Sequence, residues 1–162
     1  MKVMIVYDSF FGNTEQIARA IAGALGPPEE VGIFKVGELP EESLRGVELL
    51  VAGSPTRGFR PSPNMVIFLK QLQASSLQGV KAAAFDTRIA PADITSSILR
   101  LLVNVGGYAA KPIADSLVKK GAELAAPPEG FYVKGQEGPL KDGELERAAH
   151  WAKDLDKARQ GK

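Results

Sequence analysis

The stretch VMIVYDSFFGNTEQIARAIAGAL, residues 3–25, decides the fold of this chain. Its apolar run Val3 to Tyr7 is too short to span a membrane and is typical of a strand buried on both faces. A polar loop at 8–14 follows, and apolar residues then recur at helical spacing up to Leu25. Gly26 and two prolines end this periodic segment. The stretch therefore predicts a strand, a loop and a helix.

The loop between this strand and this helix is suited to binding an anion. The first backbone N–H groups of a helix have no partner inside the helix, and the helix dipole is positive at that end. Ser9, Asn13 and Thr14 can add side-chain donors, and Gly12 lets the backbone approach a ligand closely. A simpler interpretation stays open, in which Asn13 or Ser9 only caps the helix.

Residues 7–15, YDSFFGNTE, resemble the phosphate-binding loop of flavodoxins and related FMN-binding domains, which reads T/S-x-T-G-x-T after the first strand. Ser9, Gly12 and Thr14 match this pattern, whereas Phe11 stands where many flavodoxins have a hydroxyl group. The resemblance runs over nearly the whole chain. It implies that FMN binds with its phosphate in a loop formed by Ser9, Phe10, Phe11, Gly12, Asn13 and Thr14.

The composition is typical of one globular domain, which we expect to span residues 1–162. The chain has no Cys and a single His, which excludes disulfides, iron–sulfur ligation and multi-His metal sites. A net charge of +1, without a basic stripe interleaved with aromatics, argues against nucleic-acid binding. Because the sequence shows no secretion signal or transmembrane-length apolar run, we expect a cytoplasmic protein without membrane insertion.

The rest of the chain alternates between strand and helix patterns. Strands are predicted at 31–36, 47–52, 81–87 and 122–133, the last interrupted by Pro127 and Pro128. Helices are predicted at 37–45, with Glu41 and Glu42 in the first turn, and at 64–73, 94–105, 111–120 and 142–158. This alternation predicts an α/β fold, a three-layer α/β/α sandwich around a five-stranded parallel sheet. The resemblance implies the strand order 2-1-3-4-5, which places a ligand beyond strands 1 and 3.

The loop after the third strand carries the second part of the resemblance. Its sequence GSPTRGF, residues 53–59, is similar to the isoalloxazine-binding loop of flavodoxin-like proteins, notably of the quinone-reductase branch. Phe59 is the aromatic residue that could stack on the ring. The alternative is a rigid surface loop with an incidental Phe. The residues that the resemblance assigns to the flavin ring here are Ser54, Pro55, Thr56, Arg57, Gly58 and Phe59.

A third loop, containing Asp86, Thr87 and Arg88, is expected to follow the fourth strand at the same sheet edge. Flavodoxins often place a Tyr here, but this loop has no aromatic residue. One face of the flavin is therefore expected to be open or covered by another part of the chain. Three arginines and two acids occur in or just beyond the loops that follow the third and fourth strands. This balance predicts a positively charged rim around the flavin ring and a raised reduction potential of the flavin. These residues are Arg57, Arg60, Arg88, Asp86 and Asp93.

The helix predicted at 94–105 is apolar nearly all round. Such a helix is either buried or forms an interface. We expect it to pack inside its own domain, covering the sheet edge beside the flavin. A contact with a second copy in a dimer is the second choice.

Two redox functions agree with these patterns. The first is an FMN-binding electron-transfer protein that serves redox partner proteins. The second is an FMN-dependent NAD(P)H:quinone-type oxidoreductase with a small quinone-like acceptor. A flavin-free binding module is a third alternative. Because the flavin supplies the redox chemistry, no catalytic side chain or metal is expected. Whether the protein is an enzyme stays open. The oligomeric state, monomer or homodimer, also stays open.

Overall fold

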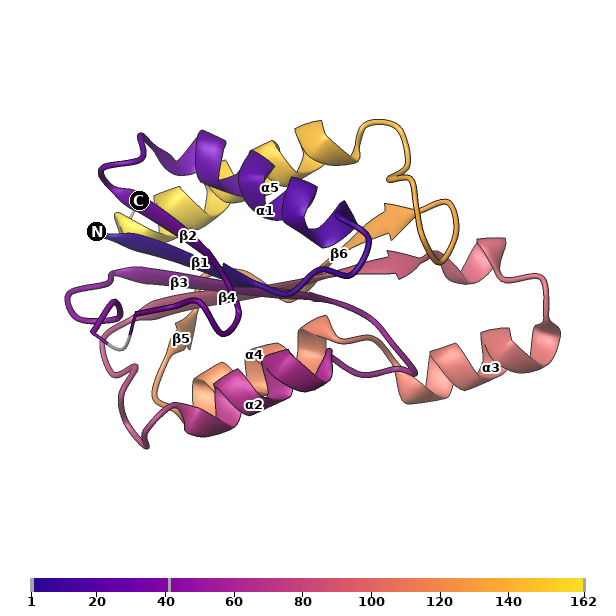
Figure 1. Ribbon diagram of the computed structural model, residues 1–162, viewed down its shortest axis with the longest axis horizontal. Helices are drawn as coiled ribbons and strands as arrows, with labels where there is room; N and C mark the ends of the chain where they lie inside the picture. Colours follow the sequence, from indigo (N-terminus) through magenta and orange to yellow (C-terminus); the bar gives the residue numbers. More distant parts are fainter. Residues whose placement is uncertain (1, 41, 162) are drawn as a thin grey trace.

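The computed structural model describes residues 2–40 and 42–161, which form a twisted parallel sheet between helices (Figure 1). The strand order is β2-β1-β3-β4-β5, and β6 also pairs with β4. Since β5 and β6 follow one another along β4, they together occupy the fifth position, and the predicted order 2-1-3-4-5 is confirmed. The strands are β1 (Val3–Tyr7), β2 (Val31–Lys35), β3 (Leu49–Pro55), β4 (Lys81–Ile89), β5 (Glu123–Leu124) and β6 (Glu129–Val133).

Helices cover both faces of this sheet, which confirms the predicted three-layer sandwich. Helices α1 (Asn13–Leu25) and α5 (Glu144–Arg159) lie together on one face (Figure 1). Helices α2 (Pro63–Gln71) and α4 (Ala110–Lys119) lie on the other. Helix α3 (Ser97–Gly106) extends beyond the carboxyl end of the sheet, after a short 3₁₀ helix at Pro91–Asp93.

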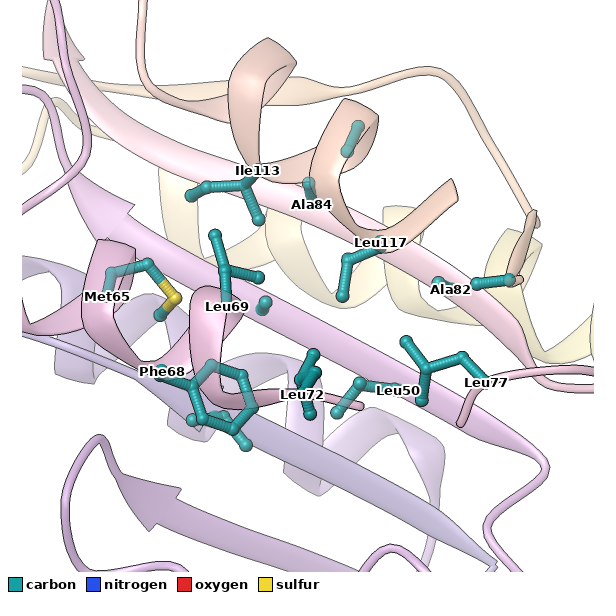
Figure 2. Close-up of a cluster of buried hydrophobic side chains, with 14 of the residues drawn as sticks. Leu50, Met65, Phe68, Leu69, Leu72, Leu77, Ala82, Ala84, Ile113 and Leu117 are labelled. Carbon is teal, nitrogen blue, oxygen red and sulfur yellow. The ribbon is translucent and has the colours of Figure 1, made fainter. Parts of the chain in front are cut away.

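Each face of the sheet carries its own apolar core. Figure 2 shows the core beneath α2 and α4, where side chains from both helices pack on β3 and β4. On the opposite face, Phe85, Phe131 and Trp151 make edge-to-face contacts with ring centroids 5.9–6.3 Å apart. Central strands buried on both faces explain the continuous apolar runs in the sequence. The residues labelled in Figure 2 are Leu50, Met65, Phe68, Leu69, Leu72, Leu77, Ala82, Ala84, Ile113 and Leu117.

The helix predicted at 37–45 is wrong, because the described residues between β2 and β3 form successive turns. Their backbone bonds join residues three apart, as from the Ser43 N–H to the Pro40 carbonyl at 3.0 Å. Gly37 and Gly46 have φ angles of 90° and 73°, so left-handed residues bound the segment at both ends. A left-handed residue at each end turns the chain away from the direction of a continuing helix. Glu41, expected in the first turn, lies outside the described residues.

Strand β4 is longer than the sequence predicts. The predicted strand 81–87 continues through Arg88 and Ile89, and Asp86, Thr87 and Arg88, which the sequence also assigned to the loop at its end, pair with Gly130, Phe131 and Tyr132 of β6. The prediction fails because β6 continues the ladder beyond the point where β5 ends. The break between β5 and β6 contains Pro127 and Pro128, as predicted, since proline cannot donate to a ladder.

Helix α3 is not buried against the sheet, so the expected packing inside the domain is wrong, although Ile94, Leu99 and Val103 of the predicted segment line a cavity at the sheet edge. Ile98 is 72% exposed and Leu101 is 63% exposed, and Leu99 and Leu102 are about half exposed. The physical reason is that α2 and α4 already cover this face of the sheet. No helix within residues 2–40 and 42–161 combines the length and the apolarity needed to cross a membrane.

Candidate functional site

A small cavity of about 80 Å³ lies where β1, β3, β4 and β6 end at one edge of the sheet. Four chain segments far apart in the sequence contribute to it, because the carboxyl ends of parallel strands meet at one edge. The structure thereby brings together ten of the predicted site residues: Ser9, Phe10, Phe11, Asn13, Thr14, Pro55, Thr56, Arg57, Thr87 and Arg88. The remaining lining residues are Ile89, Val133 and Gln136.

The first loop contributes a set of free backbone donors. The first amide of α1 with an acceptor is that of Gln16, which donates to the Gly12 carbonyl over 3.1 Å. Gly12 itself has a φ of 90°, a left-handed conformation that turns the chain into the helix. These N–H groups lie at the positive end of the helix dipole, so the loop is suited to an anion. Within the described part of the chain, the amides without an acceptor are those of Phe10, Phe11, Asn13, Thr14 and Glu15.

The side chains of the loop do not act as simple helix caps. No side chain caps α1, whose cap position is Gly12, so the capping interpretation of Ser9 and Asn13 is wrong. The Ser9 hydroxyl accepts the Gly12 N–H at 3.1 Å and so shapes the loop. Thr14 Oγ1 and Thr87 Oγ1 lie 2.8 Å apart. Because only one of these two hydroxyls donates in the pair, the hydrogen of the other is available to a ligand.

Asn13 is held from a distant part of the chain. Its side-chain amide donates to the Glu137 carbonyl at 3.1 Å, in the loop that follows β6. Gly138 in this loop has a φ of 103°, and a Cβ atom there would lie 2.6 Å from Asn13 Oδ1. The loop after β6 therefore closes tightly over the first turn of α1.

A second and larger cavity of about 520 Å³ adjoins the first and shares Thr56, Arg57, Arg88, Ile89 and Gln136 with it. Apolar side chains dominate the remainder of its lining: Phe59, Ile94, Leu99, Val103 and Tyr108. The small cavity beside the free amides is thus continuous with a wider and more apolar cavity.

The loop after β3, which the sequence assigns to the flavin ring and which we call the ring loop, forms one wall of the larger cavity. Arg57 and Arg60 pair as an antiparallel bridge, with backbone bonds of 2.9 and 3.1 Å. The two residues between them, Gly58 and Phe59, have φ angles of 55° and 67°, as in the tight turns of β-hairpins. A positive φ is rare for a bulky residue, so the turn fixes Phe59 at the cavity wall at some cost in strain.

The strand order, with cavities where β1 and β3 end, matches the fold of known structures. The structure of a flavodoxin from the domain Archaea superimposes with a TM-score of 0.76 at 22% identity, covering 99% of both chains. Flavodoxin 2 from Bacillus cereus gives a TM-score of 0.74 at 24% identity, covering 96% of this chain and 97% of that one. The chain has the flavodoxin-like fold.

A similarity in sequence is shorter. A curated flavodoxin from Picosynechococcus sp. is 38% identical to the flavodoxin-like chain over 55 residues. The match covers 34% of this chain and about a third, 32%, of that relative. No protein-family model matches the chain.

Two predicted residues support the site from beneath rather than line it. The Ser54 hydroxyl donates to the Pro55 carbonyl at 2.9 Å and accepts the Ser62 N–H at 2.8 Å, which ties the two ends of the ring loop together. Asp86 is fully buried and accepts hydrogen bonds from Arg88 at 2.6 and 2.7 Å. Burial raises the pKa of the Asp86 carboxyl, while the Arg88 guanidinium and the Ala110 N–H act in the opposite direction.

The ion pair corrects the predicted basic rim. The charge of Arg88 is balanced by Asp86 at 2.6 Å, so Arg88 adds no net charge to the cavity. Arg57 and Arg60 remain exposed, and the Arg57 guanidinium lies 5.1 Å from the centre of the Phe10 ring. Of the three predicted arginines, Arg57 and Arg60 therefore remain as sources of positive charge at the rim.

Sequence reasoning left several lining residues unassigned, and two of them, Tyr108 and Gln136, bear on how the site could hold a ligand. Tyr108 lies with its ring centre 3.8 Å from the Arg88 guanidinium and lines the larger cavity. It supplies an aromatic residue that the third loop lacks, but it comes just before α4, after the excursion through α3. Gln136 lines both cavities from the loop after β6. The sequence indicates Gln136 only through its position just after the last predicted strand.

Proposed function

We propose that this flavodoxin-like protein binds FMN at this sheet edge and transfers electrons to a redox partner protein. The observation that carries the proposal is the group of five free amides at residues 10–15, beside a small cavity that widens into a larger and more apolar one. FMN consists of a phosphate ester, a polar ribityl chain and a flat heterocycle. The phosphate matches the free amides, and the heterocycle matches the larger apolar cavity. The residues present therefore fit FMN.

The phosphate would be held by backbone amides and hydroxyl groups rather than by a cation. Residues 8–14 contain no Lys or Arg, and Thr14 is almost fully buried beside Thr87. Each hydrogen bond to a charged group is worth about 1.5–3 kcal/mol, so several such donors suffice for tight binding. The curated Picosynechococcus relative is named a flavodoxin, which supports the same assignment.

The isoalloxazine ring would lie in the larger cavity, between the ring loop and the residues that follow β4. Phe59 and Tyr108 are the aromatic side chains that could contact its faces, and Gly58 lines the same cavity without a side chain. Bound FMN would supply the redox chemistry by accepting and donating electrons. The residues of the chain would hold the cofactor, orient it and limit its contact with water.

The test is to add FMN to flavin-free protein and to record the visible spectrum after desalting. We expect one FMN per chain with quenched fluorescence, and partial recovery of fluorescence in Phe59→Ala. Ile67→Ala is a suitable control, because Ile67 is an exposed apolar residue outside both cavities. Loss of all flavin from the wild type on desalting would refute the proposal.

An FMN-dependent NAD(P)H:quinone-type oxidoreductase is the second candidate. It is favoured by the size of the apolar cavity, about 520 Å³, which leaves room for a small acceptor beside the ring. The two functions are separated by steady-state oxidation of NADH and NADPH with benzoquinone as the acceptor. A carrier shows only background oxidation, whereas saturable turnover by the FMN-loaded protein would establish the enzyme.

A further inference from the structure

Charge is distributed unevenly along the chain. Residues 49–122 contain nine Lys and Arg and three Asp, a net charge of +6, and the other residues carry a net charge of −5. All three Asp have a basic partner: Asp86 pairs with Arg88, Asp93 with Lys141 and Asp115 with Lys111. Within this segment, Lys70 of α2 and Lys111 and Lys119 of α4 belong to helices that lie on the side of the sheet opposite α1 and α5 (Figure 1).

A groove of about 500 Å³ lies between α2 and α4 on this side. Its apolar lining comes from Pro61, Val66, Leu69 and Pro112, and no Asp or Glu of the described residues lines it. We call it the basic groove, because the other residues that line it, apart from Ser116, are Arg60, Lys70, Lys119 and Lys120.

The four cations of the basic groove lack acidic partners. None of them forms an ion pair with any residue in 2–40 or 42–161. Lys120 has a neutral partner, since its ammonium group donates to the Leu72 carbonyl. The cations therefore repel one another without compensation from the described chain.

Stabilisation of the helices accounts for only part of this cluster. Lys70 and Lys119 lie in the last turns of α2 and α4, where a cation is favoured by the helix dipole. Arg60 precedes the N-terminus of α2, where the dipole disfavours a cation. Arg60 and the lack of acids around the groove therefore need an explanation outside the chain.

We propose that the basic groove docks an acidic segment of a partner protein, in which Asp or Glu residues flank an apolar side chain. The carboxylates would pair with the cations of the rim, and the apolar side chain would contact Val66 and Leu69. The exposed leucines of α3 add apolar area on the same side, and protein interfaces combine an apolar centre with a charged rim.

The ring loop joins the basic groove to the flavin site, because Arg60 lines the groove and Arg57 lines both cavities of the site. A protein docked in the groove would therefore lie beside the flavin. That it exchanges electrons there rests on the proposed function, whereas the docking itself does not.

The chemistry of the groove favours a protein over a nucleic acid. Single-stranded nucleic acids bind to basic surfaces that also present aromatic rings for stacking, and no aromatic side chain of the described residues lines this groove. Duplex binding depends on phosphate contacts and makes no use of an apolar floor. Carboxylates around an apolar side chain match both parts of the groove.

The probe is a synthetic peptide with two Glu on each side of a central Leu, titrated into ¹⁵N-labelled protein with and without FMN. We expect the amide resonances of α2 and α4 to shift at low ionic strength, in both forms of the protein. The shifts should weaken as salt rises, since exposed charges are screened within about 10 Å at 0.1 M. A peptide with Gln in place of every Glu should produce no shifts.

Two double variants with the same change in net charge locate the effect. Lys70→Glu with Lys119→Glu should lower the affinity for the acidic peptide by at least about tenfold, since two attractive pairs become repulsive. Lys35→Glu with Lys153→Glu is the control, because both lysines are exposed and outside the groove, and neither forms an ion pair with a residue in 2–40 or 42–161. The control should lose much less affinity.

Three results would overturn the proposal: equal losses in the two double variants, no shifts in α2 and α4, or tighter binding of duplex DNA that the groove variant abolishes. Binding of the peptide by flavin-free protein keeps this test separate from the proposed function. A failure to bind FMN would leave the docking result standing, and a failure to bind the peptide would leave FMN binding standing.

Discussion

Replacing Arg88 with Lys would test the ion pair beneath the site while keeping its charge. Arg88 donates to Asp86 Oδ1 from Nε at 2.6 Å and to Oδ2 from Nη2 at 2.7 Å, and its guanidinium lies 3.8 Å from the centre of the Tyr108 ring. An ammonium group cannot form two parallel bonds to a carboxylate or lie flat on a ring in this way. Gly130 packs so closely on Arg88 that a Cβ there would lie 2.1 Å from Nε, so the shorter side chain also leaves a gap.

The expected cost follows from these contacts. One hydrogen bond between charged groups contributes about 1.5–3 kcal/mol, and a cation–π contact contributes about 0.5–2 kcal/mol. We therefore expect Arg88→Lys to lower the free energy of unfolding by roughly 2–4 kcal/mol. Urea unfolding followed by the fluorescence of Trp151, the single Trp of the chain, measures this change.

Arg45→Lys is the matched control, since the Arg45 side chain is 83% exposed and lies 3.8 Å from Glu42. The control should change the stability by less than about 0.5 kcal/mol. If Arg88→Lys cost no more than this control, the paired and stacked geometry of Arg88 would not be stabilising the fold, and the reasoning would be refuted.

Three further substitutions test other parts of the structure. Burial acts to raise the pKa of Glu144, but Arg147 and the Tyr132 N–H outweigh it and lower that pKa. The resulting stability is present above the ordinary pKa of about 4.5 and is lost as the pH falls through the pKa of Glu144 in the folded protein. Glu144→Gln should therefore cost on the order of 2 kcal/mol of stability near neutral pH and less in acid. Urea unfolding at several pH values measures this difference. Leu101→Lys on α3 should leave the urea midpoint nearly unchanged, because this side chain is 63% exposed; a large loss would place it in a buried contact. Gly138→Ala should lower the melting temperature, because a Cβ would clash with Asn13 at a φ of 103°, and an unchanged melting temperature would contradict this packing.

The first strand, loop and helix could be predicted because their signals are local. An apolar run, a loop with Gly12 and a helical repeat each reflect neighbours in the sequence, and β1 spans Val3–Tyr7 as predicted. The order of the sheet came from the resemblance of this loop and the ring loop to those of flavodoxins. The separate loops then met at one edge, because parallel strands end there together.

The end of β4 could not be found in the same way. The predicted strand stops at Thr87, and only pairing with β6, more than forty residues later, extends it through Arg88 and Ile89. Once the strand is extended, the pairing of Asp86 with Arg88 follows, since residues two apart lie on the same face. The missed ion pair was thus a consequence of the missed boundary.

The helix α3 and Tyr108 show a second limit. An apolar repeat predicts that a helix has something to pack on, but it does not say whether a face of the sheet is still free. Here α2 and α4 occupy that face, so α3 extends outward and Tyr108 returns the chain to the site. The positions of α3 and Tyr108 both depend on how the other helices pack on the sheet, which a local sequence pattern does not indicate.

The most direct test of the account is the affinity of flavin-free protein for FMN and for riboflavin, measured by isothermal titration calorimetry. If the free amides at residues 10–15 hold the phosphate, FMN should bind at least about a hundredfold more tightly, since two hydrogen bonds to a charged group already supply about 3 kcal/mol or more. Thr14→Val should weaken FMN by about tenfold or more and leave riboflavin nearly unchanged. Equal affinities for FMN and riboflavin in the wild type would contradict the assignment of this loop as the phosphate site.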